Sequence, residues 1–252
     1  MSSSPESPAF QEQVRQELLA HYDTYSASDD ARLNVAGKTF TGVSGPFGIG
    51  KSTIVDEVLR IEPSIHPIHT TTTRHRKLED PAGFKTADEG VTFASMRDAI
   101  RNGEVVNYSI IPHSDIYGTF PEDFPATHTI GPFMPSSMDQ ISNAGFEAYN
   151  FVYVVAAGEL WRSFIEKSRR SLPMNTFNSR VEEALDSIEL ALDNPELLFF
   201  VENKEGEDGV RQATETIAHI ALNQTATTLD SRRAEVYLQQ MRTVAHDLVA
   251  KG

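Results

Sequence analysis

The stretch Gly45-Pro46-Phe47-Gly48-Ile49-Gly50-Lys51-Ser52 decides the fold class of this chain. It fits the pattern G-x-x-x-x-G-K-[ST] without a mismatch. A short segment that begins near Lys38 and ends at Val43 precedes it and is predicted to be a strand, and apolar residues recur at helical spacing over residues 54–59. A glycine-rich loop between a strand and a helix predicts a site that binds phosphate groups.

The residue types of this loop explain the chemistry that they predict. Glycines allow successive backbone N–H groups to point inward and phosphate oxygens to come close. Lys51 is expected to reach the β- and γ-phosphates, and the Ser52 hydroxyl is expected to ligate Mg²⁺. ATP and Mg²⁺ are therefore the predicted cofactors. The predicted nucleotide-binding residues are Gly45, Pro46, Phe47, Gly48, Ile49, Gly50, Lys51, Ser52 and Thr53.

Short apolar segments alternate with helical patterns along the rest of the chain. Strands are predicted near residues 65–71, 104–111, 127–130, 150–155 and 197–202, and helices over residues 180–192 and 210–221. Ser179 and Glu182 form a candidate capping box for the first of these helices. The alternation predicts an α/β fold with a parallel sheet that is flanked by helices, of the P-loop NTPase class.

Two further amphipathic helices are predicted outside this alternating region, over residues 11–25 and 230–250. A polar linker is predicted to follow the first of them. We expect both helices to pack on the core of the same chain, because an exposed apolar stripe is a liability. The alternative for the second helix is a dimerisation surface, so a monomer and a homodimer are both open. The expected division is 1–37, 38–222 and 223–252.

The composition excludes several classes of protein. The chain has 252 residues, and its 22 basic and 36 acidic residues give a formal net charge of -14, which argues against binding to a nucleic acid polymer. The absence of cysteine removes disulfides, thiolate zinc sites and cysteine nucleophiles. No apolar run is long enough to span a membrane, and the first ten residues do not read as a secretory signal. A cytoplasmic protein without a membrane partner is expected.

Three motifs after the loop carry a resemblance to a known family. Thr70-Thr71-Thr72-Thr73-Arg74 comes first, then Gly103-Glu104-Val105-Val106-Asn107, and then Tyr117-Gly118-Thr119. In this order they resemble the guanylate kinase family over residues 38–222. The resemblance implies a nucleoside-monophosphate-kinase-like fold, to which the two terminal helices are additions. It also implies a mobile lid near residues 160–180.

The resemblance implies an acceptor site residue by residue. Thr70 and Thr119 would approach the base, while Arg74 and Tyr117 would bind the acceptor phosphate. The second phosphate-binding arginine of the family falls on Lys77, or on Arg76 if one residue is deleted. Phosphoryl transfer needs positive charge around the transferring group. The expected catalytic set is therefore Lys51, Arg74 and the lid residues Arg162, Arg169 and Arg180. The basic cluster of the lid also contains Lys167 and Arg170. A solvated charge run or surface ion pairs would also explain this cluster.

The departures from the family concern the base and not the phosphates. Val91 stands at a tyrosine position, and Thr129-Ile130-Gly131-Pro132 replaces an Asp-Ile-Asp strand. The guanine-reading glutamate falls on Asn107, or on Tyr108 if the loop length differs, and an asparagine can accept only part of guanine's hydrogen bonds. The expected function is an ATP-dependent kinase of a nucleoside monophosphate. A kinase of a phosphosugar such as ribose bisphosphate and a catalytically silent interaction module remain alternatives.

Overall fold

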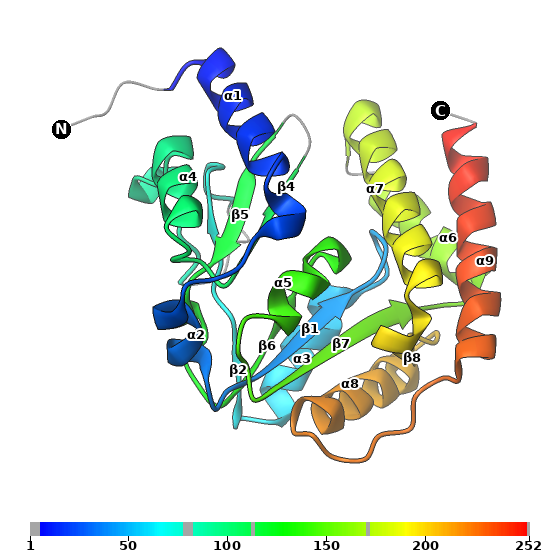
Figure 1. The fold of residues 1–252 in the computed structure, drawn as a ribbon. Coiled ribbons are helices and arrows are strands. Elements are labelled where there is room, and N and C mark those ends of the chain that lie inside the picture. Colours follow the sequence, from blue (N-terminus) through cyan, green and yellow to red (C-terminus); the bar gives the residue numbers. More distant parts are fainter. Residues whose placement is uncertain (1–5, 78–82, 112–113, 170–171, 251–252) are drawn as a thin grey trace. The chain divides into compact units, whose positions relative to one another are not determined.

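The computed structural model describes residues 6–77, 83–111, 114–169 and 172–250 (Figure 1). The chain forms two compact units, which are interleaved along the sequence. One, here called the three-stranded unit, comprises residues 1–38, 67–127 and 136–148; the other, the five-stranded unit, comprises residues 39–66, 128–135 and 149–252. The division predicted above, 1–37, 38–222 and 223–252, stays a prediction.

The five-stranded unit contains the predicted parallel sheet. Its strand order is β2 (Ile65–Pro67), β6 (His128–Pro132), β1 (Thr39–Ser44), β7 (Ala148–Val155) and β8 (Phe199–Glu202). β1 pairs in parallel with β6, and β7 pairs in parallel with β8. All residues of β1 are buried, as expected for a strand that is covered on both faces. The α/β fold class is therefore confirmed.

The helices of the five-stranded unit fall into two contacting groups (Figure 1). α3 (Lys51–Ile61) packs against α8 (Glu207–Ala221), and both contact β1 and β6. α9 (Ser231–Val249) packs against α6 (Gly158–Arg169) and α7 (Met174–Asp193). The apolar stripe of α9 is buried on its own chain, as expected. A 3-10 turn (Pro195–Leu197) leads into β8.

The three-stranded unit is built on an antiparallel sheet in the order β3 (Thr71–Thr72), β5 (Ile116–Thr119) and β4 (Asn107–Ile110). One face of this sheet joins α1 (Pro8–Leu19) and α4 (Phe93–Arg101) in an apolar cluster that includes Leu18, Met96 and Tyr108. The Glu6 carboxylate accepts the N–H groups of Phe93 and Ala94 at 2.8 and 2.9 Å, which stabilises the positive end of α4. The N-terminal helix is thus part of a packed core.

Several short helices and 3-10 turns belong to this unit or lie next to it in the sequence. They are α2 (Asp29–Val35), α5 (Met138–Ser142) and the 3-10 turns Tyr22–Thr24, Ala87–Glu89, Pro121–Asp123 and Pro135–Ser137. The predicted polar linker is wrong in part, because Ser28 accepts the Ala31 N–H and starts α2 there. No helix in the described part of the chain is both long enough and apolar enough to cross a membrane.

Several predicted boundaries are wrong, and each has a physical reason. The helix predicted over 180–192 begins at Met174, so Ser179 lies inside it and caps nothing; burial of Phe177 extends its apolar face by a turn. The strand predicted over 65–71 divides into β2 and β3, which belong to different sheets. β5 was not expected, because its sequence, Ile-Tyr-Gly-Thr, is short and contains glycine.

Candidate functional site

The phosphate loop connects β1 to α3 in the five-stranded unit, where the motif predicted it. Gly45, Gly48 and Gly50 have φ angles of 140°, 76° and 92°, a region that other residues rarely adopt. At Gly45 a side chain is also excluded by space, because an added Cβ would lie 2.7 Å from the carbonyl oxygen of Val154. The glycines of the motif are therefore required by the backbone path of the loop.

Side-chain donors hold the loop carbonyls. The Lys51 ammonium donates to the carbonyl oxygens of Gly45 and Pro46 at 2.6 and 3.0 Å. The Trp161 indole N–H, on α6, donates to the Phe47 carbonyl at 2.9 Å. The Asn203 amide, just after β8, donates to the Ile49 carbonyl at 2.8 Å. With their carbonyls held in this way, the loop residues can present backbone N–H groups to an anion.

The first turn of α3 adds a fixed positive end to the loop. Gly50 is the N-cap of this helix, and Lys51, Ser52 and Thr53 are its first residues. N–H groups in the first turn of a helix have no partner within the helix, and the helix dipole attracts negative charge to them. Ser52 and Thr53 are exposed. The loop and the helix together can hold a phosphate group.

The electrostatics of Lys51 also favour an anion. Burial of its ammonium, and next the positive charge of Arg180, lower the pKa of Lys51 to about 8, while Glu183 acts in the opposite direction. The residue as a whole is half-buried. A desolvated ammonium beside a second cation is stabilised when an anion binds. Lys51 and Arg180 therefore form a positively charged centre at the loop.

The predicted lid residues are distributed over α6 and α7. Arg180 forms an ion pair with Glu183 at 2.8 Å. Arg162 forms an ion pair with Asp247 of α9 at 3.0 Å, which agrees with the alternative of a surface ion pair. The Arg169 guanidinium lies 5.5 Å from the centre of the Phe177 ring. Arg170 lies outside the described residues. Of the three described lid arginines, Arg180 is the one whose charge lowers the pKa of Lys51. The catalytic roles stay predictions.

Several residues predicted to bind the acceptor share one face of the three-stranded sheet. In the strand register Thr72 and Ser109 both lie opposite Tyr117, and Asn107 lies opposite Thr119. Opposed residues in antiparallel strands point to the same side. Thr70 lies directly before β3, outside this register. Thr72, Ser109, Tyr117, Asn107 and Thr119 define the polar face of the sheet.

Hydrogen bonds connect the residues of this polar face. The Arg74 Nε–H donates to the Tyr117 hydroxyl at 3.2 Å, and the Arg74 guanidinium lies 5.0 Å from the Phe84 ring centre. The Thr119 hydroxyl donates to Asn107 Oδ1. The resemblance predicts Arg74 and Tyr117 at the acceptor phosphate and Asn107 and Thr119 at the base. The structure brings each pair together, and their roles stay predictions.

The two candidates for a second phosphate-binding cation differ in their surroundings. Arg76 forms an ion pair with Glu89 at 2.7 Å, and its backbone N–H donates to Asp88 at 2.7 Å. Lys77 is exposed beside it. Because Arg76 already has a carboxylate partner, binding of a phosphate there would have to displace Glu89.

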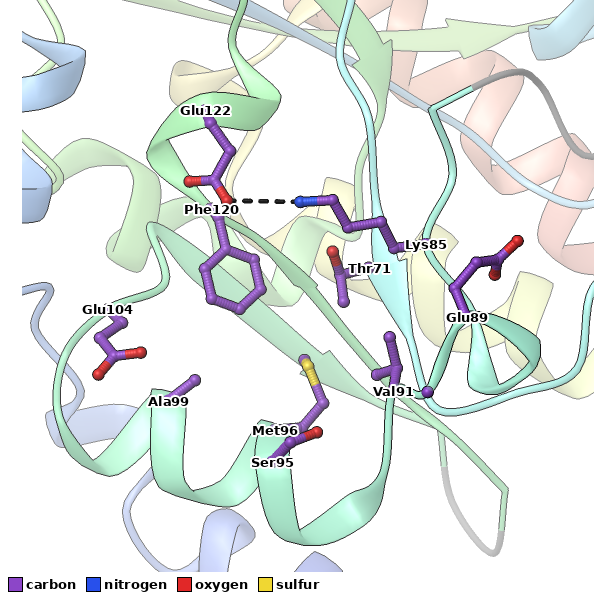
Figure 2. Close-up of a pocket in the computed structure, with 11 residues that line it drawn as sticks. Thr71, Lys85, Glu89, Val91, Ser95, Met96, Ala99, Glu104, Phe120 and Glu122 are labelled. Carbon is purple, nitrogen blue, oxygen red and sulfur yellow. Dashed lines mark hydrogen bonds and ion pairs between the residues drawn. The ribbon is translucent and has the colours of Figure 1, made fainter. Parts of the chain in front are cut away.

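A cavity of about 320 Å³ lies on the opposite face of the three-stranded sheet (Figure 2). Val91, Met96, Ala99 and Phe120 form its apolar walls, and the charged residues Lys85, Glu89, Glu104 and Glu122 line its rim. Lys85 and Glu122 are 3.4 Å apart. Val91, which stands at a tyrosine position of the resembled family, therefore lines this cavity; it is not a residue of the polar face of β3–β5.

Thr71→Val is expected to raise the free energy of unfolding by about 1 kcal/mol. The Thr71 hydroxyl oxygen is buried and has no hydrogen-bond partner among the described residues, so removing it ends a desolvation cost. Urea denaturation measures the change, and Thr71→Ser, which keeps the hydroxyl, is the control. A loss of stability in Thr71→Val alone would show that the hydroxyl has a partner.

Two residues of the loop site were not predicted as such. Trp161 and Asn203 touch loop carbonyls although they lie far along the chain. Asn203 could have been found from the sequence, because it directly follows a nearly continuous apolar strand. Functional residues of parallel sheets often lie at this position. Trp161 is the only tryptophan of the chain, but nothing in the surrounding sequence points to the loop.

Comparison with known proteins returns structures and no sequence relatives. No family profile matches the chain, and no curated protein matches it. It is similar to guanylate kinase from Anaplasma phagocytophilum, with 11% identity, 75% of this chain and 87% of that chain covered, and a TM-score of 0.46. It is also similar to a structure of the PezAT chromosomal toxin-antitoxin system of Streptococcus pneumoniae, with 11% identity, 98% of each chain covered and a TM-score of 0.32. The strand order and the loop define the fold class independently of these similarities.

Among the described residues, no group of three or more His, Asp and Glu side chains is placed to hold a metal ion. Ser52, in the exposed first turn of α3, has the hydroxyl that the loop motif predicts as a Mg²⁺ ligand.

Proposed function

We propose that the protein is an ATP-dependent phosphotransferase that converts a nucleoside monophosphate to the diphosphate. The observation that carries this proposal is the phosphate loop, in which the carbonyls of Gly45, Pro46, Phe47 and Ile49 are held by side-chain donors and Lys51 sits at the start of α3. Phosphoryl transfer is catalysed by positioning and by positive charge, and the loop supplies both.

Within this proposal each residue has a role. Lys51 and Arg180 would neutralise the charge that develops on the transferred phosphoryl group. Ser52 would hold Mg²⁺, which would neutralise part of the negative charge of the phosphate groups. Arg74 and Tyr117 would hold the phosphate of the acceptor. An intact lysine and serine in the loop argue against a catalytically silent interaction module.

A phosphosugar kinase is the second candidate, and one observation favours it. The residues that the strand register places on the polar face of β3–β5 are Thr72, Ser109, Tyr117, Asn107 and Thr119, which carry hydroxyl groups and one amide; the amide oxygen of Asn107 already accepts the Thr119 hydroxyl. Guanine presents two neighbouring donors, which a carboxylate matches better than an amide. A ribose phosphate would require only hydroxyl partners and a phosphate site.

A coupled assay of ADP release tests the proposal. The purified protein is given Mg·ATP and, one at a time, GMP, AMP, CMP, UMP and ribose bisphosphate, with Lys51→Ala measured in parallel. Turnover above the Lys51→Ala background with one of the nucleotides supports the first candidate, and turnover with the sugar alone supports the second. No turnover above that background with any acceptor would contradict both.

Asn107→Glu is expected to move the preference toward GMP if Asn107 faces the base. A carboxylate accepts from both guanine N1–H and the amino group, and discrimination by buried hydrogen bonds reaches about a hundredfold or more. The ratio of kcat/KM for GMP to that for AMP measures the change. Asn107→Gln, which keeps the amide, is the control, and an unchanged ratio in Asn107→Glu would show that Asn107 does not read the base.

Binding of tripolyphosphate is expected to weaken as the pH rises above about 8. The pKa of Lys51 is lowered to about 8 in the free protein, and a bound anion raises it again, so binding takes up a proton above that pH. The dissociation constant should approach a tenfold rise for each pH unit, because a pKa unit is equivalent to a tenfold change. Calorimetric titration between pH 7 and 10 measures it. Lys51→Arg, which stays charged, should give a flatter profile and controls for the titration of the ligand itself. Identical profiles in the wild type and in Lys51→Arg would contradict the lowered pKa.

A further inference from the structure

The C-terminal helix α9 contacts each of the elements that support the phosphate loop. Its buried face consists of Ala234, Leu238, Met241, Val244, Ala245 and Leu248, and it packs against α6 and α7. Three sets of contacts join it to residues near those that hold the loop and to the helices that carry the lid arginines. All of them lie within the five-stranded unit.

The first set joins α9 to the start of α6. The Gly158 N–H donates to Gln240 Oε1 at 3.1 Å, and a Cβ added at Gly158 would lie 3.0 Å from Gln240 Cβ and 3.2 Å from its carbonyl oxygen. The two helices therefore touch at their backbones. Three residues after Gly158, the fully buried Trp161 donates to the Phe47 carbonyl of the loop. The position of Trp161 thus depends on how closely α6 approaches α9.

The second set joins α9 to the end of β8. The Tyr237 hydroxyl donates to Glu202 at 2.8 Å, and the Arg233 guanidinium lies 3.6 Å from the other oxygen of that carboxylate. Glu202 is the residue before Asn203, whose amide holds the Ile49 carbonyl. An added Cβ at Gly50 would lie 2.9 Å from that amide nitrogen, so the loop fits closely against Asn203.

The third set consists of ion pairs to the helices that carry the lid arginines. Asp247 of α9 pairs with Arg162 of α6 at 3.0 Å. Arg242 of α9 approaches Glu189 of α7 at 3.4 Å, and α7 also carries Arg180, whose charge acts on Lys51. Both α6 and α7 are therefore joined to α9 by ion pairs.

We propose that the packing of α9 fixes the conformation of the phosphate loop. The docking of α9 and the binding of a nucleotide phosphate are then thermodynamically coupled. Three glycines with positive φ leave the loop many alternative backbone conformations, and the donors on α6 and β8 select one of them. α9 holds both donors in place. By linkage, a bound phosphate then strengthens the docking of α9 to the same extent. Gln240, Tyr237 and Asp247 are positioning residues that act through Trp161, Asn203 and α6. The nucleotide part of this inference rests on the proposed function, whereas the loop part does not.

Amide hydrogen exchange of the loop tests, without any ligand, whether α9 fixes the loop conformation. Gly158→Ala places a methyl group between α6 and α9, although alanine favours the α6 helix itself. Asp247→Asn removes the ion pair to Arg162, and Glu235→Gln neutralises one exposed carboxylate of α9 as the matched control. We expect amide exchange over residues 45–53 to accelerate about tenfold in Gly158→Ala and about threefold in Asp247→Asn, with no change in Glu235→Gln. Unchanged exchange of the loop in both test variants would overturn the inference.

The fluorescence of Trp161 and the two KM values provide further measurements. A loss of global stability alone would not raise the KM for Mg·ATP selectively. As the only tryptophan, Trp161 reports the contact with Phe47 directly. In Gly158→Ala and Asp247→Asn its quenching by acrylamide should increase, and KM for Mg·ATP should rise while KM for the acceptor stays constant. Equal rises of both KM values, or unchanged quenching, would overturn the inference. If the wild-type protein binds no Mg·ATP, the proposed function is wrong, and loop exchange and quenching still decide the role of α9.

The wild-type chain provides the test if the variants do not fold. Exchange measured at increasing sub-denaturing urea gives the free energy at which each segment opens. α9 and residues 45–53 are expected to open together, with equal free energies and equal urea dependence. Opening of α9 while the loop keeps its full protection would overturn the inference.

Discussion

Lys51→Ala is expected to lower kcat/KM for phosphoryl transfer about a thousandfold while leaving the protein folded. In the proposed function the ammonium is the charge that meets the β- and γ-phosphates, and loss of a single group that stabilises a transition state costs about 3–4 kcal/mol. The free energy of unfolding near pH 7 should change little. Burial, which lowers the pKa of Lys51, makes its charged form costly, but alanine also loses the hydrogen bonds to the Gly45 and Pro46 carbonyls, and the two effects oppose each other.

The same two measurements on Lys38→Ala provide the matched control. Lys38 Nζ also donates to a backbone carbonyl, that of Phe124, at 2.6 Å, but it belongs to the three-stranded unit. Its removal should lower stability and leave turnover of the folded fraction unchanged, the opposite pattern to Lys51→Ala. Near-normal turnover in Lys51→Ala would show that the phosphate loop is not the catalytic centre.

Arg74→Ala is expected to raise KM for the acceptor about a hundredfold and to leave the affinity for ATP unchanged. An arginine–phosphate contact is charge-assisted, and its two parallel hydrogen bonds make it among the stronger polar contacts of proteins. Arg74 already has its orientation set by the Tyr117 hydroxyl and the Phe84 ring. Separate titrations with the acceptor and with ATP measure the two affinities. Equal losses for both ligands, or a loss for ATP alone, would contradict the assignment.

Arg76→Ala and Lys77→Ala complete that experiment. Arg76 is paired with Glu89, so its removal should affect the acceptor only if a bound phosphate displaces that carboxylate. Whichever substitution raises KM for the acceptor identifies the second cation. Arg74→Lys keeps the charge but loses the paired geometry, and should fall between wild type and Arg74→Ala.

The sequence by itself determined the fold class and the place of the phosphate loop. Both are local: the residues from Gly45 to Ser52 are consecutive, and glycine is the residue that tolerates the positive φ angles found at Gly45, Gly48 and Gly50. The apolar runs that form β7 and β8 were visible in the sequence because buried parallel strands are rich in apolar residues, and Val152, Tyr153, Phe200 and Val201 are buried. The two terminal helices could be predicted from their apolar stripes, although α1 begins at Pro8 and ends at Leu19 and does not span residues 11–25 as predicted.

Only the tertiary structure decided which distant residues complete the loop and where several elements begin and end. The donors to the Phe47 and Ile49 carbonyls lie 114 and 154 residues away in the chain, and no local pattern encodes such a pairing. The division of residues 65–71 between two sheets and the earlier start of α7 at Met174 depend on which neighbours bury those residues. Propensity and spacing act over a few residues, whereas burial and hydrogen-bond partners are set by the packing of the whole unit, and this packing overrides the local signal at element ends.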